Sequence, residues 1–164
     1  MSERRWGALD LFVIAGALAL GLALFVLLPR ELPRLDPATA SWMTYEHEAL
    51  GFSCELPREY RAETDEDGVR FRFEGAPLVS ISLTTRERAA DRGLWGEHDP
   101  VGETELGGRP GALYRYEHYD GPFGMPVVSY VVPYRGRFLA VEFRNTGLDA
   151  VDRRVLGSFR FREE

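Results

Sequence analysis

The chain has 164 residues, with 20 basic and 26 acidic side chains and a net charge of −6 at pH 7. All of the basic residues are arginine, which excludes Schiff-base chemistry on lysine and phosphate loops that depend on lysine. The acidic balance also argues against a nucleic-acid partner, because affinity for the phosphate backbone comes mainly from basic residues.

A short N-terminal tail, residues 1–10, precedes an unbroken apolar run at 11–28. In a helix that rises about 1.5 Å per residue, this run extends roughly 27 Å, close to the hydrocarbon thickness of a bilayer. The nearest small-x-small triplet lies at 38–40, which is far from the apolar run for a signal-peptide cleavage site. The sequence therefore predicts a retained single-pass transmembrane helix whose partner is membrane lipid.

The orientation of this helix depends on its flanks. Arg4 and Arg5 on one side are balanced by Arg30 and Arg34 on the other, so the count of positive charges is tied. The α-amino group and the short tail favour a signal-anchor with the tail inside. We expect the rest of the chain to be extracytoplasmic.

Small residues recur at four-residue spacing within the apolar run, at Ala15, Ala19 and Ala23. Such a stripe allows a second helix to pack closely against the first. The alternative is the ordinary alanine content of an apolar helix.

Residues 29–40 contain three prolines and no periodic apolar pattern, which indicates a stiff, partly extended linker. Residues 41–164 match a single globular domain. The only cysteine, Cys54, excludes an internal disulfide and is expected to be a core thiol.

Alternating apolar and polar residues predict about seven β-strands in the domain. The segments 69–74 and 79–84 are separated by Gly-Ala-Pro and are expected to be antiparallel neighbours. Gly107-Gly108 and Arg135-Gly136 are predicted hairpin turns. The remaining predicted strands are 42–47, 51–56, a short strand ending at Leu106, 112–119, 127–134, 137–144 and a closing strand at 159–161.

Two helices are expected beside these strands, at 86–92 and in the late segment 146–157. Thr146 and Asp149 have the spacing of a capping box, and Gly157 is placed to end the helix. The predicted class is α+β, with an antiparallel sheet and flanking helices.

Three short segments resemble elements of a known family. They are 51–57 (GFSCELP) near the start of the domain, 105–110 (ELGGRP) in its middle and 155–161 (VLGSFRF) at its end. Over residues 45–161 this arrangement is similar to that of PsbP-like domains. The resemblance implies an antiparallel sheet with flanking helices, used as a binding or assembly module of extracytoplasmic or lumenal proteins, and no shared set of catalytic residues.

One acidic segment has the spacing of a calcium-binding loop. Glu63, Asp65, Asp67, Gly68 and Glu74 occupy its first, third, fifth, sixth and twelfth positions. The pattern departs from the usual one because its first ligand is Glu rather than Asp, and because the residues that follow alternate as a strand. The alternative interpretation is a solvated Asp-Gly turn.

His47, His98 and His118 each have carboxylate neighbours in the sequence. Neighbouring residues of a strand face opposite sides, so a metal or acid-base site would require the three histidines to converge in the fold. No serine lies in a nucleophile motif, and no cofactor is expected.

The segment 120–126 combines two prolines and two glycines with Phe123 and Met125, so it is expected to be an irregular loop. Apolar side chains of this kind suit the core of a protein interface, and Tyr114 and Tyr116 could extend such a surface. Cross-strand pairing explains the tyrosines equally well.

The expected function is that of a non-enzymatic, membrane-anchored binding or assembly protein with another membrane or extracytoplasmic protein as its partner. The alternative is a metal-binding or small-ligand-binding domain, such as a hydrolase, that uses the acidic turn at 63–74 or the histidines.

Overall fold

The computed structural model describes residues 17, 33–119, 124–145 and 147–162. The chain separates into two compact units, Met1–Glu31 and Leu32–Glu164, and the elements described below belong to the second. The predicted transmembrane run, with Ala15, Ala19 and Ala23, lies outside the described residues apart from Ala17, which is helical. No helix within the described residues is long and apolar enough to span a membrane.

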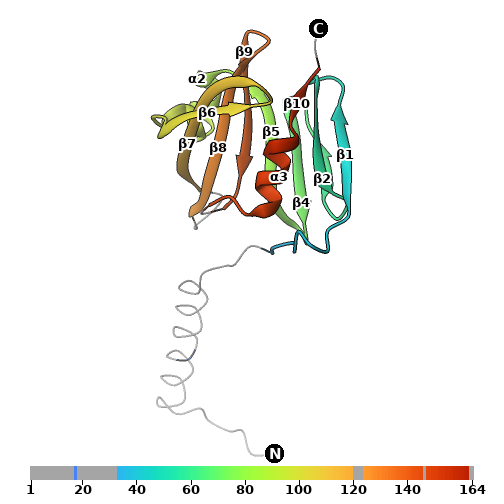
Figure 1. The fold of residues 1–164 in the computed structure, drawn as a ribbon. Coiled ribbons are helices and arrows are strands. Elements are labelled where there is room, and N and C mark those ends of the chain that lie inside the picture. The colour runs from blue at the N-terminus through green and yellow to red at the C-terminus, as the bar shows by residue number, and fades with distance from the viewer. Residues whose placement is uncertain (1–16, 18–32, 120–123, 146, 163–164) are drawn as a thin grey trace, which may run out of the picture. The chain divides into compact units, whose positions relative to one another are not determined.

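The strands of the described residues form two antiparallel sheets (Figure 1). The smaller sheet has the order β1-β2-β10 and comprises β1 (Trp42–His47), β2 (Phe52–Pro57) and β10 (Arg160–Phe161). The larger sheet has the order β3-β4-β5-β9-β8-β7-β6. Its strands are β3 (Arg61–Thr64), β4 (Gly68–Phe73), β5 (Ala76–Thr84), β6 (Gly102–Leu106), β7 (Arg109–Tyr119), β8 (Gly124–Tyr134) and β9 (Arg137–Phe143).

The predicted α+β class is confirmed, but the prediction of one sheet is wrong. The seven-stranded sheet is accompanied by a second sheet made from the first two strands and the last one. Alternation along a strand shows that one face is buried, but it does not show which strand is the neighbour. For that reason the sequence pattern did not separate the two sheets.

Both predicted hairpin turns are confirmed. Gly107 and Gly108 join β6 to β7 with φ values of 56° and 82°, and Arg135 and Gly136 join β8 to β9 with φ values of 50° and 70°. Two consecutive residues with positive φ match the right-handed twist of a two-residue hairpin. Arg135 therefore adopts a backbone conformation that usually favours glycine.

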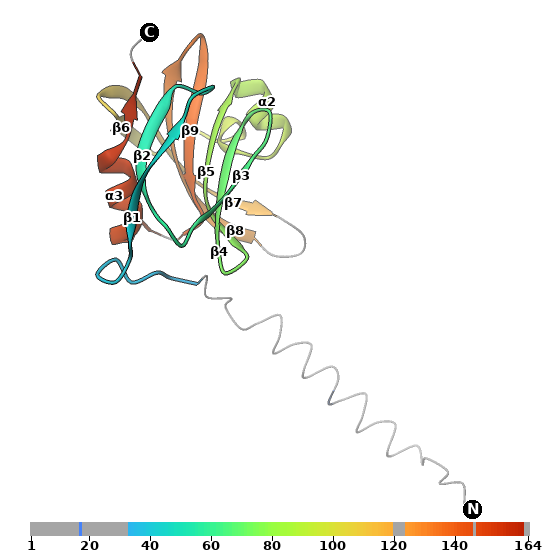
Figure 2. The same ribbon diagram turned by 90° about the vertical axis from the view of Figure 1, so that its right-hand side faces the viewer.

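The main core lies between the seven-stranded sheet and the layer formed by the small sheet and helix α3 (Ala150–Ser158). Figures 1 and 2 show α3 beside β2 in this layer, and residues of the two elements are in contact. The largest fully buried side chains of this core are Phe52, Phe71, Phe143, Phe159, Leu56, Ile81, Leu106 and Leu139.

A second, smaller core lies on the opposite face of the seven-stranded sheet. Helix α2 (Arg86–Asp91) and the 3-10 helix η1 (Trp95–Glu97) contribute Ala89 and Trp95 to it. The sheet contributes Tyr114, Tyr116, Val127, Val131 and Ala140. These short helices cover only part of that face, and a pocket occupies another part.

The N-cap of the late helix lies three residues after the predicted capping position. Asp149, rather than Thr146, is the N-cap: its Oδ1 accepts a hydrogen bond from Asp152 N at 2.9 Å, and Asp152 Oδ2 accepts one from Asp149 N at 3.2 Å. This pair is a reciprocal capping box in which Asp152 takes the place of the usual glutamate. The helix also continues through Gly157 to Ser158, so the predicted end was wrong by one residue.

Candidate functional site

A row of side chains crosses the open face of the seven-stranded sheet. The register places Arg70 of β4 opposite Ser80 of β5, Ser80 opposite Glu142 of β9, and Glu142 opposite Ser129 of β8. Residues in register on adjacent strands point to the same face. The sheet therefore places a cation, two hydroxyls and a carboxylate side by side.

Glu142 is a buried carboxylate at the centre of this row, with only 7% of the residue exposed. The Tyr116 hydroxyl donates a hydrogen bond to its Oε1 at 2.5 Å, and the Ser80 hydroxyl donates one to its Oε2 at 3.0 Å. Burial and the neighbouring negative charge of Glu142 raise the pKa of Tyr116. The phenol thus stays protonated and remains a hydrogen-bond donor to the carboxylate.

These side chains line a pocket of about 210 Å³, which we call the sheet pocket. Strands β4, β5, β7, β8 and β9 provide most of its wall, and the turn before β4 and the segment after α2 complete it. Its charged and histidine side chains are Asp65, Asp67, Arg70, Arg92, His118, Glu142 and Arg144.

The turn before β4 is held by arginines of α2 and its C-terminal cap. Asp67 forms ion pairs with Arg88 at 2.9 Å and with Arg92 at 3.1 Å. Asp65 Oδ1 accepts a hydrogen bond from Asp67 N at 3.0 Å, which closes the turn locally. This side of the pocket is therefore fixed by internal contacts.

The predicted calcium loop is not formed. Asp67 lies just before the start of β4 and Glu74 just after its end, so the extended strand separates them by roughly 20 Å. Glu63 pairs instead with Arg72 at 2.8 Å. The acidic segment is a β-hairpin turn, as the alternative interpretation held, and Asp65 and Asp67 are the two members that reach the sheet pocket.

The three histidines do not converge on one site. His47 stacks on Phe52 in the small sheet, His98 stacks on Tyr116, and His118 Nδ1 lies 3.5 Å from the Gly93 carbonyl oxygen. In the described part of the chain, no three His, Cys, Asp or Glu side chains are grouped so that they could hold a metal ion. The structure therefore does not bring the three histidines together as one site.

The residues of the predicted protein-binding surface do not all lie on the surface. Tyr114 and Tyr116 are buried, at 4% and 8% exposure, so they are core residues of the sheet rather than parts of a free surface. Met125 is half-buried and belongs to β8, which begins at Gly124, so the end of the expected irregular loop is in fact strand. Phe123 lies outside the described residues.

Cys54 is a core thiol, as predicted. It is 1% exposed, and burial raises its pKa to about 12. The side chain is therefore a neutral thiol at physiological pH and has little nucleophilic character.

Glu142 and Ser80 were not predicted as site residues. Glu142 stands in the strand sequence FLAVEF, where it is the only charged residue between buried apolar neighbours. A single carboxylate within an apolar strand sequence indicates a buried polar group, so the sequence could have pointed to Glu142. The signal did not identify Tyr116 and Ser80 as its partners, because those contacts depend on strand order.

No protein-family model matches the chain. A comparison with curated proteins also gives no match. Solved structures that align with this chain include the following two. A crystal structure from Bacteroides thetaiotaomicron VPI-5482 aligns with 14% identity and a TM-score of 0.48 over 70% of this chain, which spans only 46% of that protein.

The second similar structure is cyanobacterial PsbP (CyanoP) from Synechocystis sp. PCC 6803, determined in solution. It aligns with 14% identity and a TM-score of 0.50, over 79% of this chain and 98% of that one. At this level of identity the likeness concerns the fold alone. The described domain has a fold similar to that of PsbP, in agreement with the sequence resemblance.

Proposed function

We propose that the chain is a single-pass membrane-anchored protein whose extracytoplasmic domain binds a small polar ligand in the sheet pocket and does not catalyse a reaction. The observation that carries the proposal is Glu142, a buried carboxylate held by two hydroxyl groups on the wall of a pocket of about 210 Å³. Pockets with a few fixed polar groups are the usual form of small-molecule sites.

The chemistry of the groups favours binding over catalysis. Ser80 uses its hydroxyl proton in the hydrogen bond to Glu142, and it does not lie in a nucleophile motif of the sequence. The raised pKa of Tyr116 keeps that residue in its protonated form. Both groups can therefore orient a ligand by hydrogen bonding.

The ligand site can be tested by filling it. Ser82 is a half-buried residue of β5 that lines the pocket, so Ser82→Trp should occlude the pocket. The full chain in nanodiscs would be examined by ligand-observed NMR against a mixture of amino acids, organic acids, amines and polyols. We expect at least one compound to bind to the native chain and not to Ser82→Trp.

Thr104→Trp is a matched control, because Thr104 is a half-buried residue of the edge strand β6 that does not line the pocket. This variant should bind as the native chain does. Binding that is equal in all three proteins, or absent from the native chain, would contradict the proposed site.

The membrane anchor is supported by the length of the apolar run at 11–28, and its orientation by the short N-terminal tail at 1–10. The protein should remain in the membrane fraction after alkaline carbonate extraction, whereas a chain without residues 1–28 should be released. A C-terminal reporter enzyme that is active only outside the cytoplasm should be active on the full chain. An inactive reporter would overturn the proposed orientation.

A protein partner at the segment 120–126 is a second candidate. Tyr119, which precedes this segment, is a large aromatic side chain that is 65% exposed. Crosslinking in native membranes should capture a partner, and a Phe123→Ala/Met125→Ala double substitution should reduce the capture. An unchanged set of captured proteins would exclude this surface.

A further inference from the structure

The polar row of the sheet pocket places opposite charges two strands apart. Arg70 on β4 and Glu142 on β9 both line the pocket, and Ser80 on β5 lies between them in register. Adjacent strands are about 4.8 Å apart, so the Cα atoms of Arg70 and Glu142 are separated by roughly 10 Å. A molecule that lies over Ser80 could contact a guanidinium group at one end and a carboxylate at the other.

Glu142 lacks a cationic partner within the described residues. It accepts hydrogen bonds from the neutral hydroxyls of Tyr116 and Ser80, one to each oxygen. A carboxylate has about four acceptor positions, so positions remain on Glu142 for further donors. Because a buried charge is costly unless it is paired, a ligand ammonium group at this position would be favourable.

Arg70 provides the complementary charge at the other end of the row. Its side chain is exposed, and among the described residues none accepts a hydrogen bond from its guanidinium group. The planar guanidinium fork can bind a carboxylate through two parallel hydrogen bonds. A ligand carboxylate therefore has a suitable partner at this end of the pocket.

The charged lining of the pocket is balanced overall. Its cations are Arg70, Arg92 and Arg144, and its anions are Asp65, Asp67 and Glu142. A ligand of one sign alone would be attracted to one end of the row and repelled by the other. A ligand that carries both signs, in the order of the row, is attracted at both ends, to Arg70 and to Glu142.

We propose that the sheet pocket binds a small zwitterion, with its ammonium group against Glu142 and its carboxylate against Arg70. This inference rests on the proposed function, because it requires the pocket to be a ligand site. The volume of about 210 Å³ equals that of roughly seven water molecules at ~30 Å³ each, which suits a molecule of amino-acid size. The separation of Arg70 and Glu142 favours charges at opposite ends of a short chain over the adjacent charges of an α-amino acid.

Calorimetry on the full chain in nanodiscs tests this charge pattern with four probes of similar length. The zwitterion is 4-aminobutanoate, its singly charged analogues are butanoate and butan-1-amine, and the neutral probe is erythritol. We expect 4-aminobutanoate to bind at least about tenfold more tightly than each of the other three, the usual effect of one charge-assisted hydrogen bond.

Two substitutions test the two ends of the row. Arg70→Gln and Glu142→Gln should each weaken the binding of 4-aminobutanoate at least about tenfold. Arg61→Gln is the matched control, because Arg61 is an exposed strand arginine of β3 outside the pocket, and it should leave the affinity unchanged. Since Arg70 is exposed, its substitution remains informative even if Glu142→Gln does not fold.

The Ser82→Trp variant separates failure of this inference from failure of the proposed function. Equal or tighter binding of butanoate, butan-1-amine or erythritol, still abolished by Ser82→Trp, would overturn the zwitterion while the pocket remains a ligand site. Binding of 4-aminobutanoate that neither Arg70→Gln nor Ser82→Trp alters would also overturn it. No binding of any probe would overturn the zwitterion, and failure of the broader NMR mixture as well would overturn the site itself.

Discussion

The two faces of the seven-stranded sheet have the same strands but different surroundings. One face is closed by the small sheet and α3, and it is apolar and aromatic throughout its centre. The other face is covered by α2 and η1 over part of its area and opens into the sheet pocket elsewhere. Strand β5 shows the contrast within consecutive residues: the Ile81 side chain belongs to the core of the closed face, whereas Ser80 and Ser82 point to the opposite face, where Ser80 contacts Glu142.

This difference shows how one sheet serves stability and ligand binding separately. On the closed face, apolar burial at roughly 25 cal/mol per Å² stabilises the fold. On the open face, hydrogen bonds from specific partners hold buried polar groups in place, as those from Tyr116 and Ser80 hold Glu142. Substitutions on the closed face should therefore affect stability, whereas several positions on the open face should tolerate change.

The largest expected effect is on the closed face. Phe143 is fully buried there and makes an edge-to-face contact with Tyr130 at 6.3 Å between ring centroids. Phe143→Ala should lower the free energy of unfolding by about 3–5 kcal/mol, because it removes a large apolar side chain and leaves a cavity. Urea denaturation measures the change.

Ser82→Ala provides the comparison on the open face. Ser82 is half-buried beside the pocket, and its substitution should change the free energy of unfolding by about 0.5 kcal/mol or less. If Phe143→Ala fails to fold, Ile81→Val should still lower stability by about 0.5–1.5 kcal/mol. Similar losses from Ile81→Val and Ser82→Ala would remove the distinction between the faces.

Much of the fold was predictable because alternation and turn chemistry are local signals. The segments 69–74 and 79–84 alternate in the sequence and form β4 and β5, and both glycine-containing hairpin turns are in place. The short helix at 86–92 was also predicted and is α2, with Thr85 as its N-cap. Strand β3 was missed, because all four of its residues are exposed and show no apolar alternation.

The candidate site was much less predictable, because it depends on strand order. Glu142 lies 62 residues from Ser80 in the sequence, and only the pairing of β9 with β5 places it beside Ser80 and Arg70. His118 and Asp67 were singled out as metal ligands, yet the fold uses them as parts of a pocket wall. The sequence showed which residues are polar, but which of them are in contact depends on the order of the strands.

The second prediction concerns a close backbone approach at the pocket. A Cβ atom at Gly68 would lie 2.2 Å from the Ile81 carbonyl oxygen, which belongs to the rigid backbone of β5. Gly68→Ala should therefore lower the free energy of unfolding by about 3 kcal/mol. This effect would refine the comparison of the two faces, because substitution at one position on the open face would then lower stability as much as substitution in the core.

Gly102→Ala is the matched control, because Gly102 also begins a strand and its Cβ would meet no atom within 4 Å. This substitution should be neutral or slightly stabilising, by up to about 1 kcal/mol, because alanine restricts the unfolded chain. Thermal denaturation of both variants would decide the point. Equal melting temperatures would contradict the close approach at Gly68.

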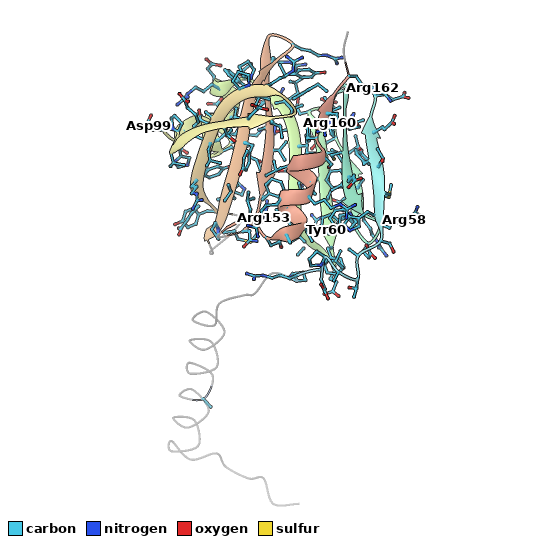
Figure 3. The ribbon with its side chains drawn as sticks, viewed as in Figure 1. Arg58, Tyr60, Asp99, Arg153, Arg160 and Arg162 are labelled. Carbon is cyan, nitrogen blue, oxygen red and sulfur yellow. The ribbon has the colours of Figure 1, made fainter. Side chains whose placement is uncertain are left out.

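The third prediction concerns a buried carboxylate on the closed side of the sheet. Asp152 lies in α3, the helix that covers the closed face. It is close to Tyr60, which is labelled in Figure 3. Burial, with a smaller contribution from Asp149, raises the pKa of Asp152 from 3.8 to about 6. The native state then binds this proton more tightly than the unfolded state, so stability falls as pH rises from about 4 through 6.

Asp152→Asn should remove this dependence while its side-chain oxygen still accepts the hydrogen bond from Asp149 N. At pH 8 the variant should be more stable than the native chain by on the order of 2–3 kcal/mol, and at pH 4 the difference should vanish. Asp149→Asn should keep most of the slope, because burial is the larger cause. Parallel stability curves for Asp152→Asn and the native chain would rule out the raised pKa.

The smallest effect compares one tyrosine hydroxyl on each side of the sheet. Tyr116 donates to the Glu142 carboxylate at 2.5 Å on the open face, and Tyr134 donates to the Gly51 carbonyl oxygen at 3.0 Å on the closed face. Hydrogen bonds to charged groups contribute more than neutral ones, so Tyr116→Phe should lower the free energy of unfolding by about 2 kcal/mol and Tyr134→Phe by about 1 kcal/mol. In the Glu142→Gln background the effect of Tyr116→Phe should fall to that of Tyr134→Phe, because the acceptor is then neutral. If the effect of Tyr116→Phe is the same in both backgrounds, Glu142 is not the charged acceptor on which the sheet pocket depends.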